Sequence, residues 1–148
     1  MRDDIEIFPC LPENETEVVN ILSDANLPTE DLSSKMLKNF LVARKKGGAT
    51  AGIIGLEPCG RSGLLRSLVV LPPFRGSGLG KRLVSGLESH ARRMGIETLF
   101  LLTMTAADFF PGLGYQVIRR GQAPEAIADT TEFKSLCPQS AVCMSKSL

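Results

Sequence analysis

Residue types on which metal and redox sites depend are scarce in this sequence of 148 residues. It has no tryptophan, one tyrosine, one histidine and four cysteines, and no two cysteines form a C-x-x-C pair. Since a zinc site normally needs several histidine or cysteine ligands, we expect no metal. The cysteines stand among apolar or turn residues and are expected to be buried or incidental thiols rather than disulfides. They are Cys10, Cys59, Cys137 and Cys143.

The sequence also lacks a charge excess and a long apolar run. Lys and Arg total 17 against 16 for Asp and Glu, which leaves no net field to attract nucleic acid or an anionic membrane surface. No apolar stretch reaches the roughly 18 residues that a spanning helix needs. The segment Met1–Asp4 is acidic, whereas a signal peptide begins basic and continues apolar. We therefore expect a cytoplasmic protein with no nucleic-acid or membrane partner.

What is present is an ordinary globular composition, with 43% hydrophobic and 22% charged residues. A chain of this length can bury a substantial core around one sheet. No internal repeat or low-complexity linker divides it. We therefore predict a single domain over residues 1–148.

Hydrophobic periodicity predicts strands and helices in a mixed order. A short strand at 5–7 precedes a helix at 13–26 and a second helix that begins at a Thr29 cap. The segment 64–71 is a nearly continuous apolar run, typical of a strand in the centre of a sheet. The other predicted elements are strands at 40–43, 49–56, 98–103, 115–118 and 140–144, a long helix at 79–94, and short helices at 105–112 and 123–131.

One βαβ unit stands out in this order. The strand at 64–71, a glycine-rich turn, the helix at 79–94 and the strand at 98–103 should form a right-handed parallel crossover. Apolar residues recur every four positions along that helix and predict one buried stripe. The fold class is therefore α/β. The stripe consists of Leu79, Leu83, Leu87 and Ala91.

The glycine-rich turn, residues 75–80, reads Arg-Gly-Ser-Gly-Leu-Gly and stands where the long helix begins. Glycines let successive backbone N–H groups converge, and a helix start adds the positive end of its dipole, so such places bind anions. Arg75 can add a charge-assisted contact or brace the loop. No Gly-Lys-Ser/Thr ends the turn, which excludes a P-loop, and a strand meander upstream fits a Rossmann fingerprint poorly. A phosphate-bearing ligand is predicted here.

The pattern Arg-x-x-Gly-x-Gly, following a strand that ends in Val-x-Pro, resembles the acetyl-CoA signature of the GNAT N-acetyltransferases. The order of predicted elements resembles that superfamily over nearly the whole chain. The resemblance implies a mixed sheet of about six to seven strands flanked by about four helices, with acetyl-CoA as co-substrate. The residues implied to bind the coenzyme are Leu68, Val69 and Val70 at the pantetheine arm, and Arg75, Gly76, Ser77, Gly78, Leu79, Gly80 and Lys81 at the pyrophosphate.

Other segments resemble particular subfamilies within this superfamily. Leu101–Ala106 is similar to a segment in the acetyltransferase domain of N-acetylglutamate synthases. The same segment, together with Leu65–Val70 and the tail at 131–138, resembles the small bacterial arsenic-resistance-associated GNAT acetyltransferases. This resemblance implies that the substrate is an amino acid or a toxic arsenic- or phosphorus-containing analogue. Phe110 stands where a family tyrosine often protonates the departing thiolate, so that acid is absent here.

Three residues are candidates for chemistry at the acceptor. Glu57, at the end of a strand beside the central one, is the candidate base, or else a solvated strand end or an ion-pair partner of Arg66. Arg66, predicted to share a strand face with Leu68, is a candidate to grip a substrate carboxylate, or else a residue that faces solvent. Thr103 ends the parallel strand, where ligands gather in open α/β sheets, or is a plain strand terminus.

The preferred function is acetyl-CoA-dependent N-acetylation of a primary amine of a small molecule. A catalytically weak acyl-CoA-binding module is an alternative because Phe110 lacks a hydroxyl group. Acetylation of a protein or peptide amine is a further alternative function. The apolar segment Ala141–Met144 could also pair across two subunits and form a homodimer.

Overall fold

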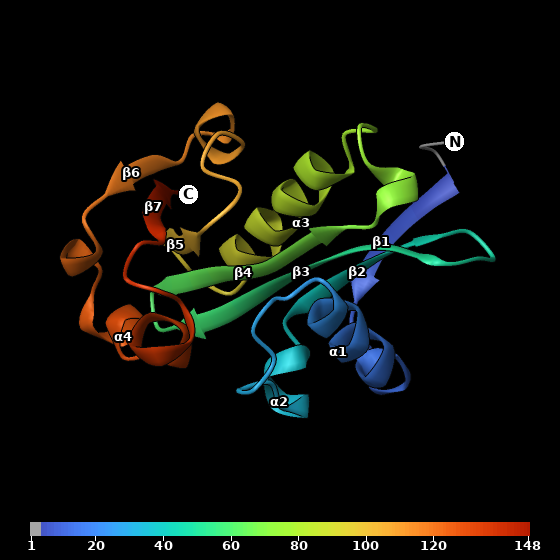
Figure 1. The fold of residues 1–148 in the computed structure, drawn as a ribbon, viewed down its shortest axis with the longest axis horizontal. Coiled ribbons are helices and arrows are strands. Elements are labelled where there is room, and N and C mark those ends of the chain that lie inside the picture. The colour runs from blue at the N-terminus through green and yellow to red at the C-terminus, as the bar shows by residue number, and fades with distance from the viewer. Residues whose placement is uncertain (1–3) are drawn as a thin grey trace.

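The computed structural model describes residues 4–148 and contains a seven-stranded sheet. From edge to edge its strand order is β1-β2-β3-β4-β5-β7-β6 (Figure 1). The strands are β1 (Ile5–Pro9), β2 (Phe40–Lys45), β3 (Thr50–Cys59), β4 (Ser62–Val70), β5 (Thr98–Thr103), β6 (Gln116–Ile118) and β7 (Val142–Ser147). The helices are α1 (Glu15–Asp24), α2 (Ser34–Leu37), α3 (Leu79–Arg93) and α4 (Glu125–Ala128), and a π-helical turn spans Glu132–Leu136.

β4 and β5 are parallel, and the other neighbouring strands of the described sheet are antiparallel. α3 connects the two parallel strands, which confirms the predicted βαβ unit. The predicted mixed sheet with about four helices is also confirmed.

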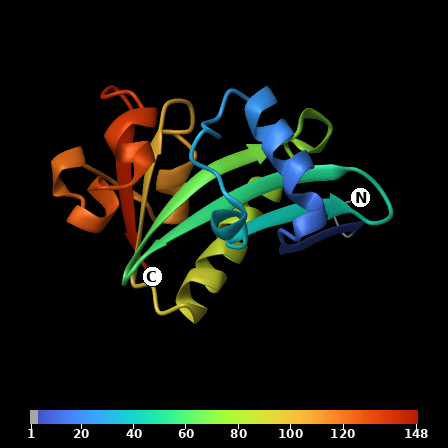
Figure 2. The same ribbon diagram turned by 90° about the horizontal axis from the view of Figure 1, so that it is seen from below.

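Helices cover both faces of the sheet. α3 lies on one face, and α1, α2 and α4 lie on the other (Figures 1 and 2). α3 buries the predicted stripe and packs mainly on β3, β4 and β2. Its chain turns away after Arg93 through Gly95, whose φ is +83°. No helix within residues 4–148 is long and apolar enough to cross a membrane.

The second helix begins later than the sequence predicts. Ser33, not Thr29, is the N-cap of α2, and its Oγ accepts a hydrogen bond from the Met36 amide at 3.3 Å. Residues 25–33 consequently form a loop between α1 and α2. Asp31, which the predicted helix would carry in its first turn, instead forms an ion pair with β4.

β4 separates from β5 soon after both strands begin. Ser62–Leu64 pair with Thr98–Phe100, and the rest of β4 has no described strand beside it on this edge. A bulge in the pairing with β3 falls at Ser67, whose φ of +61° is rare outside glycine. The bulge breaks the alternation of side chains, so Leu68 packs on the α3 side while Arg66 points to the opposite side. The prediction that these two residues share one face is wrong for this reason.

β7 lies in the interior of the sheet. It pairs with β5 along one edge and with β6 along the other. A strand with both edges occupied cannot extend the sheet into a second subunit. In this structure Ala141–Met144 thus has no free strand edge for a second subunit, and the homodimer stays a prediction.

Candidate active site

An open cleft follows the edge that β4 exposes after it leaves β5. Its larger part is a cavity of about 510 Å³, and an adjoining part measures about 330 Å³. The smaller part reaches Arg75 and Gly80 of the glycine-rich loop, and the larger part reaches Arg66 and Glu132. The two parts form one passage because they share the lining residues Ala25, Leu27, Leu68, Thr105 and Ala106.

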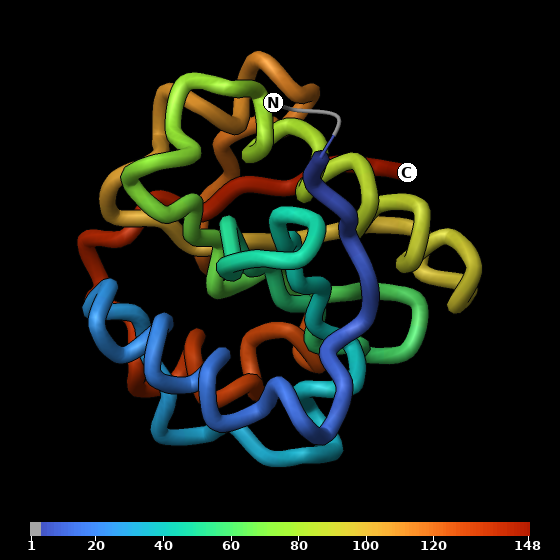
Figure 3. Tube along the Cα trace, turned by 90° about the vertical axis from the view of Figure 1, so that its right-hand side faces the viewer, coloured from blue at the N-terminus to red at the C-terminus, as the bar shows by residue number. Residues whose placement is uncertain are grey.

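Two segments far apart in the sequence form the walls of the larger part. One is the loop after α1, at residues 25–28, and the other is the chain before β7, at residues 136–138. Both lie on the same side of the sheet, where the blue and red parts of the chain approach one another (Figure 3). The cleft is therefore completed by the last quarter of the described chain.

The glycine-rich loop has the backbone shape that an anion site requires. Gly76 and Gly78 have φ values of +79° and +82°, and Gly78 is the N-cap of α3. A Cβ atom at Gly76 would meet no atom within 4 Å, so a ligand can approach the main chain closely. The first amides of a helix have no intrahelical partner and lie at the positive end of its dipole. The loop therefore fits a diphosphate.

Side chains of the loop support its shape. Arg75 Nε donates a hydrogen bond to the carbonyl oxygen of Val70 at 3.0 Å, and Ser77 Oγ donates to that of Phe74 at 2.6 Å. Arg75 thus braces the loop, which is one of its two predicted roles. These two side chains thus stabilise the backbone shape of the loop.

The end of β4 lines the part of the cleft next to the loop. Leu68, Val69 and Val70 all border the smaller cavity. Because no described strand pairs with this edge of β4, its main-chain groups, apart from the Val70 carbonyl that accepts from Arg75, are available to a ligand. The geometry is compatible with the predicted contacts to a pantetheine arm. These contacts, like those of Leu79, Gly80 and Lys81, stay predictions.

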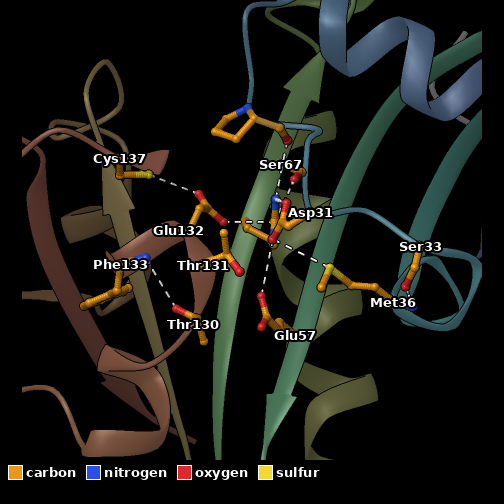
Figure 4. Close-up of polar contacts among 12 residues, drawn as sticks. Asp31, Ser33, Met36, Glu57, Ser67, Thr130, Thr131, Glu132, Phe133 and Cys137 are labelled. Carbon is orange, nitrogen blue, oxygen red and sulfur yellow. Dashed lines mark hydrogen bonds and ion pairs between the residues drawn. The ribbon is translucent and has the colours of Figure 1, made fainter. Parts of the chain in front are cut away.

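Arg66 is the centre of a buried ion cluster at the other end of the cleft. Its side chain has no exposed surface and pairs with three carboxylates from three elements (Figure 4). Asp31, in the loop after α1, accepts from both terminal nitrogens, at 2.6 Å and 2.9 Å. Glu57 of β3 lies 3.3 Å from Nη1, and Glu132 of the π-helical turn lies 2.9 Å from Nε. One positive charge therefore faces three negative ones.

The cluster contains two of the three predicted acceptor residues, Glu57 and Arg66. Glu57 pairs with Arg66, which is the alternative that the sequence left open, and it does not line the cleft in the described structure. Arg66 does line the cleft, but its guanidinium already binds three carboxylates. To grip a substrate carboxylate, Arg66 would have to exchange one of these partners.

Sequence reasoning missed Glu132 as a functional residue. It lines the larger part of the cleft with a side chain only 8% exposed. Burial raises the pKa of its carboxyl group, while Arg66 and the Cys137 hydrogen bond act in the opposite direction. Burial likewise raises the pKa of Glu57. The only signal for Glu132 was its place in the tail segment 131–138, because its partner lies on a distant strand.

The aromatic residues after β5 supply no proton donor to the cleft. Phe110 lines the larger part, and its ring packs edge-on against Tyr115 with centroids 5.4 Å apart. The Tyr115 hydroxyl donates to Glu88 of α3 at 2.9 Å, and Lys146 donates to the same carboxylate oxygen. Burial and Glu88 raise the pKa of Tyr115. Tyr115 is therefore a core residue, only 2% exposed.

Thr103 closes the turn after β5. Its Oγ1 accepts hydrogen bonds from the amides of Thr105 and Ala106, at 3.3 Å and 2.9 Å. Its hydroxyl proton is left available, and the residue lines the larger part of the cleft. Both predicted readings, a strand terminus and a ligand contact, are compatible with this position. No group of three or more His, Cys, Asp or Glu residues in the described chain is arranged to hold a metal ion.

Sequence comparison finds relatives that are longer than this chain. An amino-acid acetyltransferase of Pseudomonas syringae pv. tomato is 37% identical over 141 residues, which is 87% of this chain and 32% of the relative. The N-alpha-acetyltransferase 80 of Mus musculus is 40% identical over 67 residues, 45% of this chain and 20% of the relative. The chain thus spans about a third or less of the curated relatives it matches first.

Solved structures share the fold at low identity. N-acetylglutamate synthase from Neisseria gonorrhoeae, complexed with coenzyme A and N-acetyl-glutamate, superposes with a TM-score of 0.82 at 18% identity, over 97% of this chain and 35% of that one. Rv2747 from Mycobacterium tuberculosis, in complex with CoA, gives 0.80 at 19% identity, over 97% and 99%. The acetyltransferase (GNAT) domain family matches residues 37–117, which include β4, the glycine-rich loop and α3. Since this match covers more than half of its length, the chain belongs to the GNAT acetyltransferase family.

Proposed function

We propose that this chain transfers the acetyl group of acetyl-CoA to the primary amine of a small molecule, with amino acids as the first substrate class to test. The observation that carries the proposal is the continuous cleft, which joins an anion-binding loop at one end to a buried ion cluster at the other. A long, flexible thioester with a diphosphate needs a passage of this kind.

Different parts of the chain perform the separate steps of binding and transfer. The amides at the start of α3 hold the diphosphate, and the unpaired edge of β4 orients the pantetheine arm and polarises the thioester carbonyl. The acceptor amine then enters from the end lined by Thr103 and Glu132. Since Phe110 has no hydroxyl group, the thiolate leaves unassisted or is protonated by water, which its pKa near 8.5 permits.

Relatives named amino-acid acetyltransferases support the choice of substrate class. The resemblance to arsenic-associated enzymes adds amino-acid analogues that contain arsenic or phosphorus to the panel, and remains a prediction. An amino-acid substrate needs a partner for its carboxylate. Arg66 is the cation that lines the larger part of the cleft, so its exchange of one carboxylate partner is part of this proposal.

The experiment is a thiol-release assay with acetyl-CoA against a panel of amino acids, alkylamines and short peptides. The proposal expects turnover that is fastest for a small amine. A binding module, favoured by Phe110, would bind coenzyme A in calorimetry and release no thiol with any amine. Fastest turnover with peptides would move the substrate class to protein or peptide amines.

A further inference from the structure

Glu132 is unlike the other two carboxylates around Arg66 because it also borders the cleft. Among the described residues that line either part, it is the single acidic side chain. Asp31 and Glu57 contact the same guanidinium but do not line the cleft. Glu132 is therefore the carboxylate that an acceptor bound in the cleft can reach.

The π-helical turn holds Glu132 firmly. Phe133 is buried next to it in a cluster with Leu64 and Phe100. Arg120 donates hydrogen bonds to the Phe133 carbonyl at 2.6 Å and to the Cys137 carbonyl at 3.2 Å, and its guanidinium lies over the Phe133 ring. Side chains on both sides of the turn thus fix the position of the carboxylate.

The two oxygens of Glu132 have different surroundings. Oε1 accepts a hydrogen bond from the Cys137 thiol at 3.3 Å. Oε2 is buried, lies 2.9 Å from Arg66 Nε, and has no hydrogen bond from any described residue. Nε directs its own hydrogen bond to Ser67 Oγ at 3.3 Å. Oε2 therefore keeps acceptor capacity that its ion pair with Arg66 does not use.

The charge of the cluster favours a cationic ligand. Asp31 alone neutralises Arg66 through two hydrogen bonds, so Glu57 and Glu132 leave two negative charges in excess when all groups are ionised. A bound ammonium group would offset part of this excess. A neutral amine requires that the ammonium group first loses a proton, and a carboxylate beside it can accept one.

On the basis of the proposed function, we propose that Glu132 is the catalytic base that takes the proton from the substrate ammonium group. The N–H bond breaks, an O–H bond forms on Glu132, and the freed nitrogen lone pair attacks the thioester carbonyl carbon. The C–S bond then breaks, and the second nitrogen proton ends on the coenzyme sulfur. Glu132 returns its proton to solvent, so that the products are the amide, coenzyme A and one proton.

The surroundings of Glu132 suit this role. Burial raises the pKa of its carboxyl group, Arg66 and the Cys137 thiol lower it, and Asp31 and Glu57 raise it. Arg120 faces Cys137 from the outer side of the turn. A carboxylate whose pKa is raised by burial is a stronger base than one in water, and it remains paired with a fixed cation.

The test compares the pH dependence of kcat/KM for the wild type and for Glu132→Gln with the best amine of the panel. At pH 7 we expect the variant to be roughly a hundredfold slower. Its deficit should narrow as the pH rises toward the pKa of the amine, because only amine already deprotonated in solution can then react. The wild type should instead reach its plateau at lower pH. A Glu132→Gln profile that is lower but parallel to the wild-type profile overturns the proposal.

Two further variants separate the outcomes. Glu57 is the rival candidate for the base. The Glu57→Gln variant should keep the acid limb of the wild-type kcat/KM profile, whatever its absolute rate. If Glu57→Gln loses the acid limb and Glu132→Gln keeps it, Glu57 is the base. Glu17→Gln, in an exposed ion pair with Arg44, serves as a surface control. Coenzyme A binding by calorimetry and a thermal melt verify that each variant folds. If the wild type releases no thiol, the proposed function is refuted together with this inference. If the wild type is active but the pH profile of Glu132→Gln stays parallel to it, only this inference is refuted.

Discussion

The two ends of the cleft bind charge in opposite ways. At the end proposed to hold the coenzyme diphosphate, the available groups are main-chain amides of one continuous segment, shaped by the left-handed glycines Gly76 and Gly78. At the acceptor end, they are buried side chains from four separate elements, gathered around Arg66. The first arrangement tolerates an empty site because water can satisfy exposed amides. The second depends on each member, since a charge buried without its partner is costly.

This contrast predicts a division of effects. Substitutions in the glycine-rich loop should mainly reduce ligand binding and affect folding only through backbone strain at Gly76 and Gly78. Substitutions in the ion cluster should reduce folding stability first. Three of the following four measurements test this division, and the Tyr115 variant tests a buried contact outside the cleft; the largest expected effect comes first.

Arg66→Met should destabilise the fold by about 3–5 kcal/mol, because it leaves two buried carboxylates and the partly buried Glu57 without their cation. The loss should shrink as the pH is lowered, since protonation of these carboxyls removes their charge. The free energy of unfolding in urea at pH 5 and pH 8 measures both effects. Arg44→Met, which removes an exposed ion pair with Glu17, should cost at most about 1 kcal/mol. Equal losses for the two variants would contradict the contrast.

Gly78→Glu should weaken coenzyme A binding at least a hundredfold, which corresponds to about 2.7 kcal/mol. It places a negative charge where the diphosphate is proposed to bind, at a residue with φ of +82°. Gly60→Glu is the matched control, because Gly60 has φ of +67° in the β3–β4 turn and shares the backbone strain without the site. Isothermal calorimetry measures binding, and a thermal melt measures stability. Similar affinities for both variants would place the diphosphate elsewhere.

Tyr115→Phe should destabilise the fold by about 1.5 kcal/mol, since it removes a buried hydrogen bond to the charged Glu88. Lys146 remains to pair with that carboxylate, which limits the cost. The acid and base limbs of kcat/KM should not move, because the phenol lies outside the cleft. A lost base limb would instead identify Tyr115 as the acid that protonates the thiolate.

The smallest effect should be a change in the pH dependence of stability in Glu132→Gln. Burial raises the folded-state pKa of Glu132, so its contribution to stability is fully present below the unfolded pKa of about 4.3 and is lost as the pH rises through the folded value. The variant lacks this titration. Its stability relative to the wild type should therefore improve as the pH rises from 4 to 8, as measured by urea unfolding. A constant difference would show that Glu132 is not desolvated.

The sequence was informative where structure is local. Gly76, Gly78 and the start of α3 lie within one short segment, and the stripe of α3 recurs with helical spacing, so both could be predicted from residue order. The acceptor end could not. Asp31 and Glu132 are far from Arg66 in the sequence, and their pairing depends on the sheet that brings their elements together.

Two local errors have physical causes of the same kind. Thr29 has the residue type of a helix cap, but the helix begins after Ser33, and Asp31 pairs with a strand. Arg66 and Leu68 stand at alternate positions of β4, but the bulge at Ser67 sends them to opposite faces. In both cases a tertiary contact outweighs a local preference.

The interior position of β7 has a consequence for the order of folding during synthesis. Within residues 4–148, β6 pairs with no strand except β7, and the segment that carries Glu132 lies between the two in the chain. While residues 142–147 remain inside the ribosome, β6 therefore has no neighbour and one wall of the cleft is tethered at only one end. The acceptor end of the cleft is therefore complete only once β7 has paired with both β5 and β6.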